Sequence, residues 1–276
     1  MYPGKYAEQN PDRSAFVMAA TGERVSYQEF EARSNRVAHY LADKGLGFQD
    51  HYSIFMENNN RYLESCAAGE RSGLYFTCIN SFLMSDELAY IINNSESQIL
   101  ITSMSKLEAA QEALAQCTAI KEVLVVGAGD ADLPEGMSDF ASTLSKYPET
   151  PLERELLGAA MLYSSGTTGR PKGIVRPLPE QSPNEPLPVI GFLSGLWRYR
   201  EDMIYLSPAP LYHSAPQAAV GLTLRMGGTV VIMERFDPAD YLRFVEEYQV
   251  SHSQLVPTMF SRMLKMPEED RTKYDL

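Results

Sequence analysis

Short apolar runs alternate along the chain with segments in which apolar residues recur every three or four positions. The runs have the length and composition of buried strands, whereas the intervening segments have the period of an amphipathic helix. We expect strands at residues 14–19, 51–56, 75–79, 98–102, 122–126, 160–163, 203–206, 229–233 and 253–256. Because helical segments of about ten residues or more separate most of them, the pattern predicts an α/β fold of mostly parallel sheets flanked by helices.

Capping signals place the ends of several helices. Ser26 and Glu29 have the spacing of a capping box, in which each side chain accepts a hydrogen bond from a free backbone N–H of the first turn. Asp237 followed by Pro238 is typical of an N-cap with proline at the first helical position. The three asparagines at 58–60 are candidates for capping the helix that follows them.

One long segment interrupts this alternation. Residues 127–157 are polar and contain three prolines, and loops of this length are uncommon inside one compact unit. We therefore divide the chain into a first α/β subdomain at 1–157 and a second, incomplete one at 158–276. Residues 177–188 carry alternate prolines and few apolar side chains, which predicts a surface excursion without helix or central strand.

Composition and charge exclude several classes of protein. Of the 276 residues, 44% are hydrophobic and 22% are charged, which is ordinary for a globular chain. The net charge of −12 repels nucleic-acid phosphates and anionic membranes, so we expect neither as a partner. No apolar run approaches the roughly 20 residues that a transmembrane helix needs. The three dispersed cysteines fit a reducing compartment, and the first residues lack the features of a signal peptide, so we expect a cytoplasmic protein.

The segment most informative about chemistry is YSSGTTGRPKG at residues 163–173, directly after an apolar run. Its small residues leave backbone N–H groups free to turn inward as an anion nest, and its hydroxyls add further donors. Arg170 and Lys172 supply the positive charge that the chain as a whole lacks. We expect phosphate to be bound by the residues that share these properties: Ser164, Ser165, Gly166, Thr167, Thr168, Gly169, Arg170 and Lys172.

Three better-known glycine-rich motifs do not match this segment. A Walker A loop needs Ser or Thr after its lysine, but Gly173 follows Lys172. The spacing of Gly166 and Gly169 lacks the third glycine of a dinucleotide-binding turn. No glycine stands two positions before Ser164 or Ser165, as a lipase-type nucleophile elbow requires.

The same segment resembles the phosphate loop of the adenylate-forming superfamily, which includes acyl-CoA synthetases, firefly luciferase and nonribosomal adenylation domains. Further stretches resemble motifs of that superfamily in the same order, and the last of them is similar to a motif of fatty-acyl-CoA synthetases. These stretches are VSYQEF at 25–30, ELAYII at 87–92, PLYHS at 210–214 and VPTM at 256–259.

The resemblance implies a two-step reaction that uses ATP, Mg²⁺ and coenzyme A. A small carboxylic acid, fatty or aryl, would form an acyl-adenylate, and a thiol would then displace AMP to give a thioester. In this reading Lys172 neutralises the phosphates as a catalytic residue, and Thr167 also contacts the metal ion.

The resemblance also suggests residues on the acyl side of the site. His213 would lie between the carboxylate and the adenylate and orient the carboxylate as a second catalytic residue. Tyr212, Gln217 and Met259 are candidate walls of the substrate pocket, with ordinary core packing as the alternative for each.

The sequence matches only the first part of the superfamily's pattern of motifs, and Leu276 precedes several of them. Two other interpretations therefore stay open: a non-catalytic nucleotide- or acyl-binding module, and a structural protein that keeps only the fold. An incomplete sheet would also expose an apolar edge, which favours a homodimer.

Because the superfamily's later motifs carry its adenylation lysine and metal-binding carboxylate, we expect little or no ligase turnover from this chain alone. ATP–pyrophosphate exchange measured with a panel of carboxylic acids tests this expectation. Robust exchange by the isolated chain would contradict it.

Overall fold

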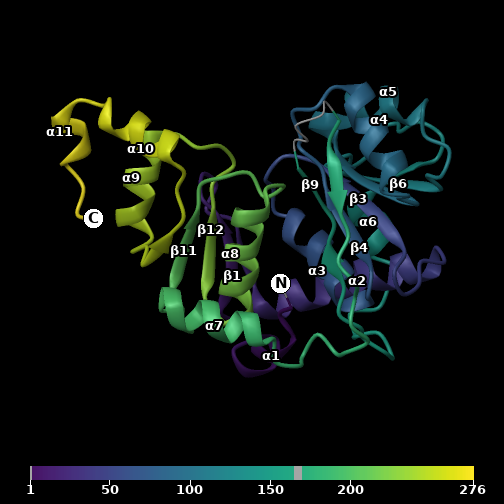
Figure 1. Cartoon of the computed structure of the whole chain (residues 1–276), viewed down its shortest axis with the longest axis horizontal. Helices are drawn as coiled ribbons and strands as arrows, with labels where there is room; N and C mark the ends of the chain where they lie inside the picture. Colours follow the sequence, from purple (N-terminus) through teal and green to yellow (C-terminus); the bar gives the residue numbers. More distant parts are fainter. Residues whose placement is uncertain (1, 165–169) are drawn as a thin grey trace.

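The computed structural model describes residues 2–164 and 170–276 and confirms the predicted α/β class. A six-stranded sheet has the order β7-β6-β5-β3-β4-β8, and all neighbouring strands in it run parallel (Figure 1). Its strands are β3 (His51–Phe55), β4 (Tyr75–Cys78), β5 (Ile99–Ser103), β6 (Glu122–Val126), β7 (Met137–Asp139) and β8 (Ala159–Ala160).

The second sheet has five strands in the order β13-β11-β12-β1-β2 and is parallel except for the β1–β2 pair. Its strands are β1 (Ser14–Met18), β2 (Arg24–Ser26), β11 (Ile204–Ser207), β12 (Thr229–Ile232) and β13 (His252–Ser253). The pairing crosses the expected division at residue 157 in both directions. β1 and β2 from the start of the chain belong to this sheet, and β8 from beyond the division closes the other.

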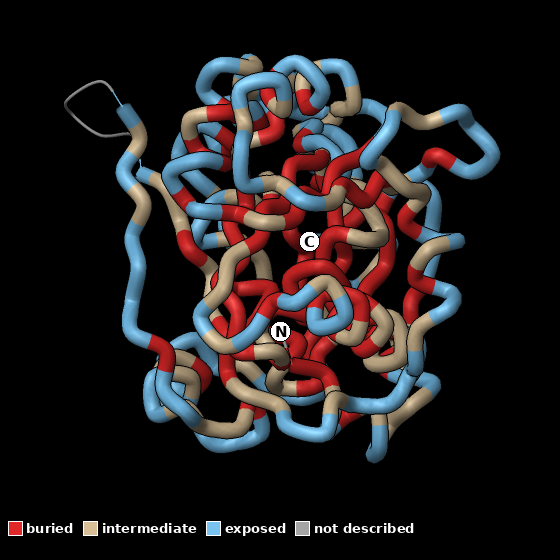
Figure 2. Tube along the Cα trace, turned by 90° about the vertical axis from the view of Figure 1, so that its right-hand side faces the viewer, coloured by how far each residue is buried: buried red, intermediate tan, exposed pale blue. Residues whose placement is uncertain are grey.

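Helices form layers on both sides of each sheet, and the buried residues lie between these layers (Figures 1 and 2). α2, α3 and α8 share one apolar core between the two sheets, α4 and α5 cover the far face of the six-stranded sheet, and α9 and α10 cover the far face of the other. Their bounds are α2 (Tyr27–Asp43), α3 (Tyr62–Ser72), α4 (Ser85–Asn94), α5 (Leu107–Leu114), α8 (Ser214–Arg225), α9 (Pro238–Glu247) and α10 (Pro257–Leu264). The remaining helices are α1 (Gly4–Gln9), α6 (Phe140–Leu144), α7 (Pro188–Trp197), α11 (Glu268–Arg271) and the 3₁₀ turn η1 (Met104–Lys106).

Two predicted caps are confirmed and one is wrong. The capping box of Ser26 and Glu29 opens α2, and the Asp237 carboxylate accepts hydrogen bonds from two backbone N–H groups of α9. The asparagines at 58–60 do not cap α3, because that helix begins at Tyr62 after a residue whose side chain makes no cap hydrogen bond. Their amides donate to other partners instead.

The irregular segments contain more structure than their composition suggests. Residues 127–157 include β7, which adds a strand to the six-stranded sheet, and the short helix α6 behind it. The apolar run at 160–163 divides between two sheets, because β8 ends at Ala160 and β9 (Leu162–Ser164) pairs elsewhere. Residues 177–187 have neither helix nor strand, as expected, but α7 begins at Pro188.

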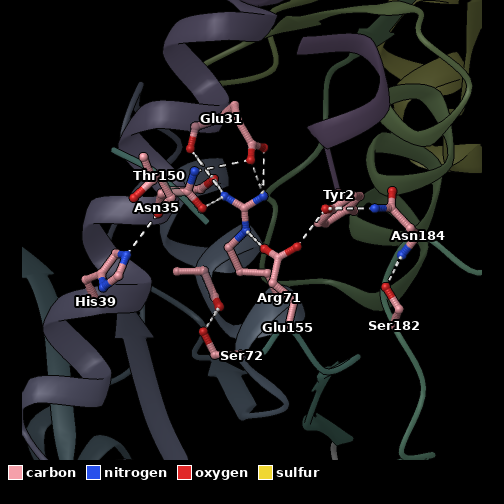
Figure 3. Close-up of polar contacts among 12 residues, drawn as sticks. Tyr2, Glu31, Asn35, His39, Arg71, Ser72, Thr150, Glu155, Ser182 and Asn184 are labelled. Carbon is pink, nitrogen blue, oxygen red and sulfur yellow. Dashed lines mark hydrogen bonds and ion pairs between the residues drawn. The ribbon is translucent and has the colours of Figure 1, made fainter. Parts of the chain in front are cut away.

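A fully buried guanidinium, that of Arg71 on α3, joins four separate parts of the chain (Figure 3). Its Nη2 atom donates to both carboxylate oxygens of Glu31 on α2 at 2.7 Å, and its Nε lies 2.9 Å from Oε1 of Glu155. The ring of Tyr2 lies under the guanidinium, 5.2 Å from its carbon, while the Tyr2 hydroxyl donates to Oε2 of Glu155 at 2.7 Å. Asn184 in turn donates to that hydroxyl, so the proline-containing segment is also fixed here.

The preceding residue, Glu70, makes the connection to the other sheet. Nε of Arg225, at the end of α8, donates to Oε1 of Glu70 at 2.9 Å, and Nη1 of Arg225 donates to the carbonyl of Pro183. Burial by itself would raise the pKa of Glu70, but the Arg225 guanidinium opposes it and the pKa falls to about 2. The carboxylate therefore stays ionised at neutral pH and holds α3 against α8.

Within the described residues, no helix is both long and apolar enough to span a bilayer.

We expect Arg71→Met to lower the free energy of unfolding by about 3–5 kcal/mol, because it removes the only cation paired with the largely buried carboxylates of Glu31 and Glu155 among the described residues. Arg154→Met is the matched control, since its ion pair with Glu180 is exposed on both sides and contributes no more than about 1 kcal/mol. Urea unfolding followed by circular dichroism measures both variants. A loss below about 1 kcal/mol for Arg71→Met would contradict the proposed importance of this contact.

Candidate active site

The segment with the phosphate-binding signal begins and ends in a small antiparallel hairpin. β9 pairs with β10 (Lys172–Ile174), with Lys172 opposite Ser164 and Gly173 opposite Tyr163. β8 runs parallel to β4 and precedes β9 by one residue, so the hairpin leaves the six-stranded sheet at its carboxyl edge (Figure 1). This is the edge at which open α/β sheets bind ligands.

Five positions of the predicted phosphate loop lie outside the described residues: Ser165, Gly166, Thr167, Thr168 and Gly169. The flanking residues are described. Ser164, Arg170 and Lys172 are exposed, and no acidic side chain among the described residues forms an ion pair with Lys172. The Lys172 ammonium and the exposed Ser164 hydroxyl opposite it form a local positive site in a chain of net charge −12. The geometry around the loop is thus open to an anion.

Gly173 allows the hairpin to pack closely at this point. A Cβ atom at residue 173 would lie 2.9 Å from the Tyr163 ring, closer than real Cβ contacts, and would also clash with the Met161 side chain. A side chain here would therefore displace Tyr163 and with it the β9 strand that carries Ser164.

His213 lies at the carboxyl edge of the other sheet. It is the N-cap residue of α8, and five residues separate it from the end of β11. Its imidazole is tilted against the ring of Tyr212, with centroids 4.3 Å apart. Partial burial lowers the pKa of His213, which favours the neutral imidazole at pH 7.

Asn58 joins the carboxyl edges of the two sheets. Its amide nitrogen donates to the carbonyls of Ala209 at 3.2 Å and Met233 at 2.9 Å, and its oxygen accepts from the backbone N–H of Leu211 at 2.9 Å. Asn58 follows β3 in the chain, but its side chain forms all three hydrogen bonds with backbone atoms that follow β11 and β12. It therefore fixes the connection that leads to His213 relative to the six-stranded sheet.

The other predicted pocket residues have different surroundings. Tyr212 is half-buried beside His213. Gln217 is buried, and its amide nitrogen donates to the Cys78 sulfur at 2.9 Å. Met259 is buried in the apolar cluster of α9 and α10. Both buried side chains have contacts within the fold, and their contribution to a substrate pocket stays a prediction.

The described residues contain no group of three His, Cys, Asp or Glu side chains that could hold a metal ion. Thr167, the predicted contact of Mg²⁺, belongs to residues 165–169 and lies outside the described part of the chain.

Sequence reasoning missed two sets of residues near these edges. The sequence predicts a helix cap at Asn58, and only its position after a buried strand indicates the carboxyl edge. Tyr90 and Asn94 contact the hairpin from α4, and their spacing of four residues on the polar face of an amphipathic helix was the available signal.

Comparison with known proteins gives a family match over almost the whole chain. The model of the family described as "AMP-binding enzyme" matches residues 5–276.

Individual relatives agree with this match. 4-Coumarate–CoA ligase 1 from Petroselinum crispum is 27% identical over 270 residues, which cover 96% of this chain and 48% of the relative. A ligase from Mycolicibacterium smegmatis, named medium/long-chain-fatty-acid–CoA/3-oxocholest-4-en-26-oate–CoA ligase, is 28% identical over 255 residues, covering 87% of this chain and 46% of its own. The chain thus spans about half the length of these curated relatives.

A solved structure has the same fold. The crystal structure of ATP-bound MatB from Rhodopseudomonas palustris superposes with a TM-score of 0.75 at 26% identity, covering 98% of this chain and 53% of that one.

We expect the His213 imidazole to titrate below the ordinary value of 6.5, because burial disfavours its charged form. An NMR pH titration of the histidine C–H signals, assigned with His213→Gln, measures the midpoint. In Asn58→Ala the connection to His213 should loosen and the midpoint should move back toward 6.5. A wild-type midpoint at or above 6.5 would contradict the expectation.

Proposed function

The chain belongs to the AMP-binding enzyme family, and from this premise we propose that it forms the nucleotide- and carboxylate-binding part of an acyl-CoA ligase. The observation that carries the proposal is the exposed Lys172 ammonium opposite Ser164, at the base of a hairpin at the carboxyl edge of a parallel sheet. The CoA ligases among the relatives support it.

The proposed reaction has two steps. A carboxylate oxygen attacks the α-phosphorus of ATP, the bond from that phosphorus to the β-phosphate bridging oxygen breaks, and pyrophosphate leaves with the electron pair. The thiol sulfur of coenzyme A then attacks the acyl carbon, loses its proton, and AMP leaves. The first step brings two anions together and places more charge on the leaving group, so catalysis depends on positioning and on fixed positive charge.

In this proposal Lys172 neutralises the phosphates as a point charge, and Arg170 adds a planar fork of donors. The Ser164 hydroxyl lies across the hairpin from Lys172 and would donate to the same phosphates. The donors at residues 165–169 complete the loop as predicted from the sequence, since glycines and hydroxyls supply the remaining N–H and O–H groups.

His213 is proposed to orient the acyl carboxylate. A neutral imidazole can donate one hydrogen bond to a carboxylate without forming an ion pair that would reduce the nucleophilicity of its oxygen, and the lowered pKa of His213 favours that neutral form. Tyr212, whose ring packs against the imidazole, is proposed as a neighbouring wall of the acyl site.

The substrate class remains an acyl or aryl carboxylic acid, because the named relatives include a 4-coumarate ligase and a medium/long-chain fatty-acid ligase. ATP and coenzyme A are the proposed co-substrates. Mg²⁺ is the proposed cofactor, which would neutralise phosphate oxygens when bound. A cytoplasmic location and a homodimer stay predictions from the sequence.

We expect Lys172→Ala to weaken ATP binding by about 10- to 100-fold, the loss of one charge-assisted contact to phosphate. Isothermal titration calorimetry with ATP and with AMP measures the affinity, and AMP should lose less because it lacks the β- and γ-phosphates. Lys121→Ala is the matched control, since that exposed ammonium donates to Gln98 away from the hairpin.

Equal ATP affinity for Lys172→Ala and the wild type would overturn the proposed phosphate site. Lys172-dependent binding without any acid-dependent pyrophosphate exchange would instead favour a non-catalytic nucleotide-binding module.

A further inference from the structure

One helix, α4, is hydrogen-bonded to both sides of the hairpin of β9 and β10, which flanks the predicted phosphate loop. The Tyr163 hydroxyl on β9 donates to Oδ1 of Asn94 at 2.7 Å. On the other side, the Tyr90 hydroxyl donates to the carbonyl of Pro171, just before β10, at 3.1 Å. Tyr90 and Asn94 are four residues apart and therefore lie on the same side of the helix.

Tyr90 makes a second contact with its ring. The Arg170 guanidinium carbon lies 5.1 Å from the ring centroid, within the range of a cation–π interaction. Arg170 is otherwise exposed, and no ion pair with an acidic side chain of the described residues holds it. The ring thus gives this long cation a defined resting position.

The opposite face of α4 is firmly anchored. Leu88, Ala89, Ile91 and Ile92 are buried in the apolar cluster behind the six-stranded sheet. The hairpin itself is only two short strands, and such hairpins are marginal on their own in water. The hydrogen bonds from Tyr90 and Asn94 therefore restrict the motion of the strands that carry Ser164 and Lys172, because α4 is itself anchored in the core.

We propose that Tyr90 and Asn94 are positioning residues for the phosphate site, a role that rests on the proposed function. Asn94 fixes the strand that carries Ser164, and the Tyr90 hydroxyl fixes the strand that carries Lys172. The Tyr90 ring holds Arg170 beside the loop until nucleotide phosphates, which form stronger charge-assisted hydrogen bonds than a ring face, recruit it. Holding the guanidinium in place reduces the rotamer entropy lost on binding.

The first test needs no nucleotide. Amide hydrogen exchange of the free protein should be faster across residues 162–164 and 172–174 in Tyr90→Leu and Asn94→Leu, and unchanged in β3 and β5. Asn93→Leu is the matched control on the same helix, because its amide donates to the Gln116 carbonyl rather than to the hairpin. Unchanged hairpin exchange in both variants would overturn the inference, whatever the nucleotide affinity.

The second test uses ATP titration and a double-mutant cycle. Tyr90→Leu should weaken ATP binding by about threefold to tenfold, while Tyr90→Phe, which keeps the ring, should weaken it less. In an Arg170→Ala background, the loss from Tyr90→Leu should be smaller than in the wild type and should approach the loss from Tyr90→Phe, because the ring has lost its cation and only the hydroxyl contact is left to remove. A purely structural Tyr90 would give the same loss in both backgrounds, which would overturn its role toward Arg170.

The wild type and Lys172→Ala are titrated in parallel. Absence of Lys172-dependent binding in the wild type would overturn the proposed function and with it the phosphate role of Tyr90. Lys172-dependent binding that is insensitive to both Tyr90→Leu and Asn94→Leu would overturn this inference alone.

Discussion

The arrangement of the molecule depends on one buried cation, the guanidinium of Arg71. A charge removed from water is tolerated only when opposite charges lie close to it, and here the carboxylates of Glu31 and Glu155 and the ring of Tyr2 surround it. Each partner comes from a different part of the chain, so satisfying the charge also fixes their relative positions. The neighbouring pair of Glu70 and Arg225 extends this constraint to α8 and hence to the second sheet.

These ion pairs of Arg71 and Arg225 explain how the carboxyl edges of the two sheets come close together. With α2, α3 and α8 locked between the sheets, β3 and β11 end close enough for Asn58 to bind backbone atoms on the other side. The connection before His213 is therefore held by two hydrogen bonds from one amide, and a third goes to the carbonyl of Met233 after β12. A site assembled from both sheets needs such a bridge, because neither sheet alone positions residues of the other.

Electrostatics then separates this region from the rest of the surface. The chain carries a large net negative charge, which disfavours anions in general, yet Arg170 and Lys172 face solvent together at one hairpin. α4 holds that hairpin through polar contacts and holds the core through apolar ones. The same helix thus connects the stability of the six-stranded sheet to the position of the cations.

The alternation of apolar runs and helical periods was enough to predict the parallel α/β architecture, and the residues of the capping box were enough to place the start of α2, because both depend on local spacing. The candidate phosphate segment was likewise visible from its composition. The pairing of β1 with β12 was not, since more than 200 residues separate Phe16 from its partner Val230 and no local pattern encodes such a pairing. Nor could the sequence assign Asn58, Arg71 or Tyr90, whose roles arise from backbone atoms and charges brought near them only by tertiary packing.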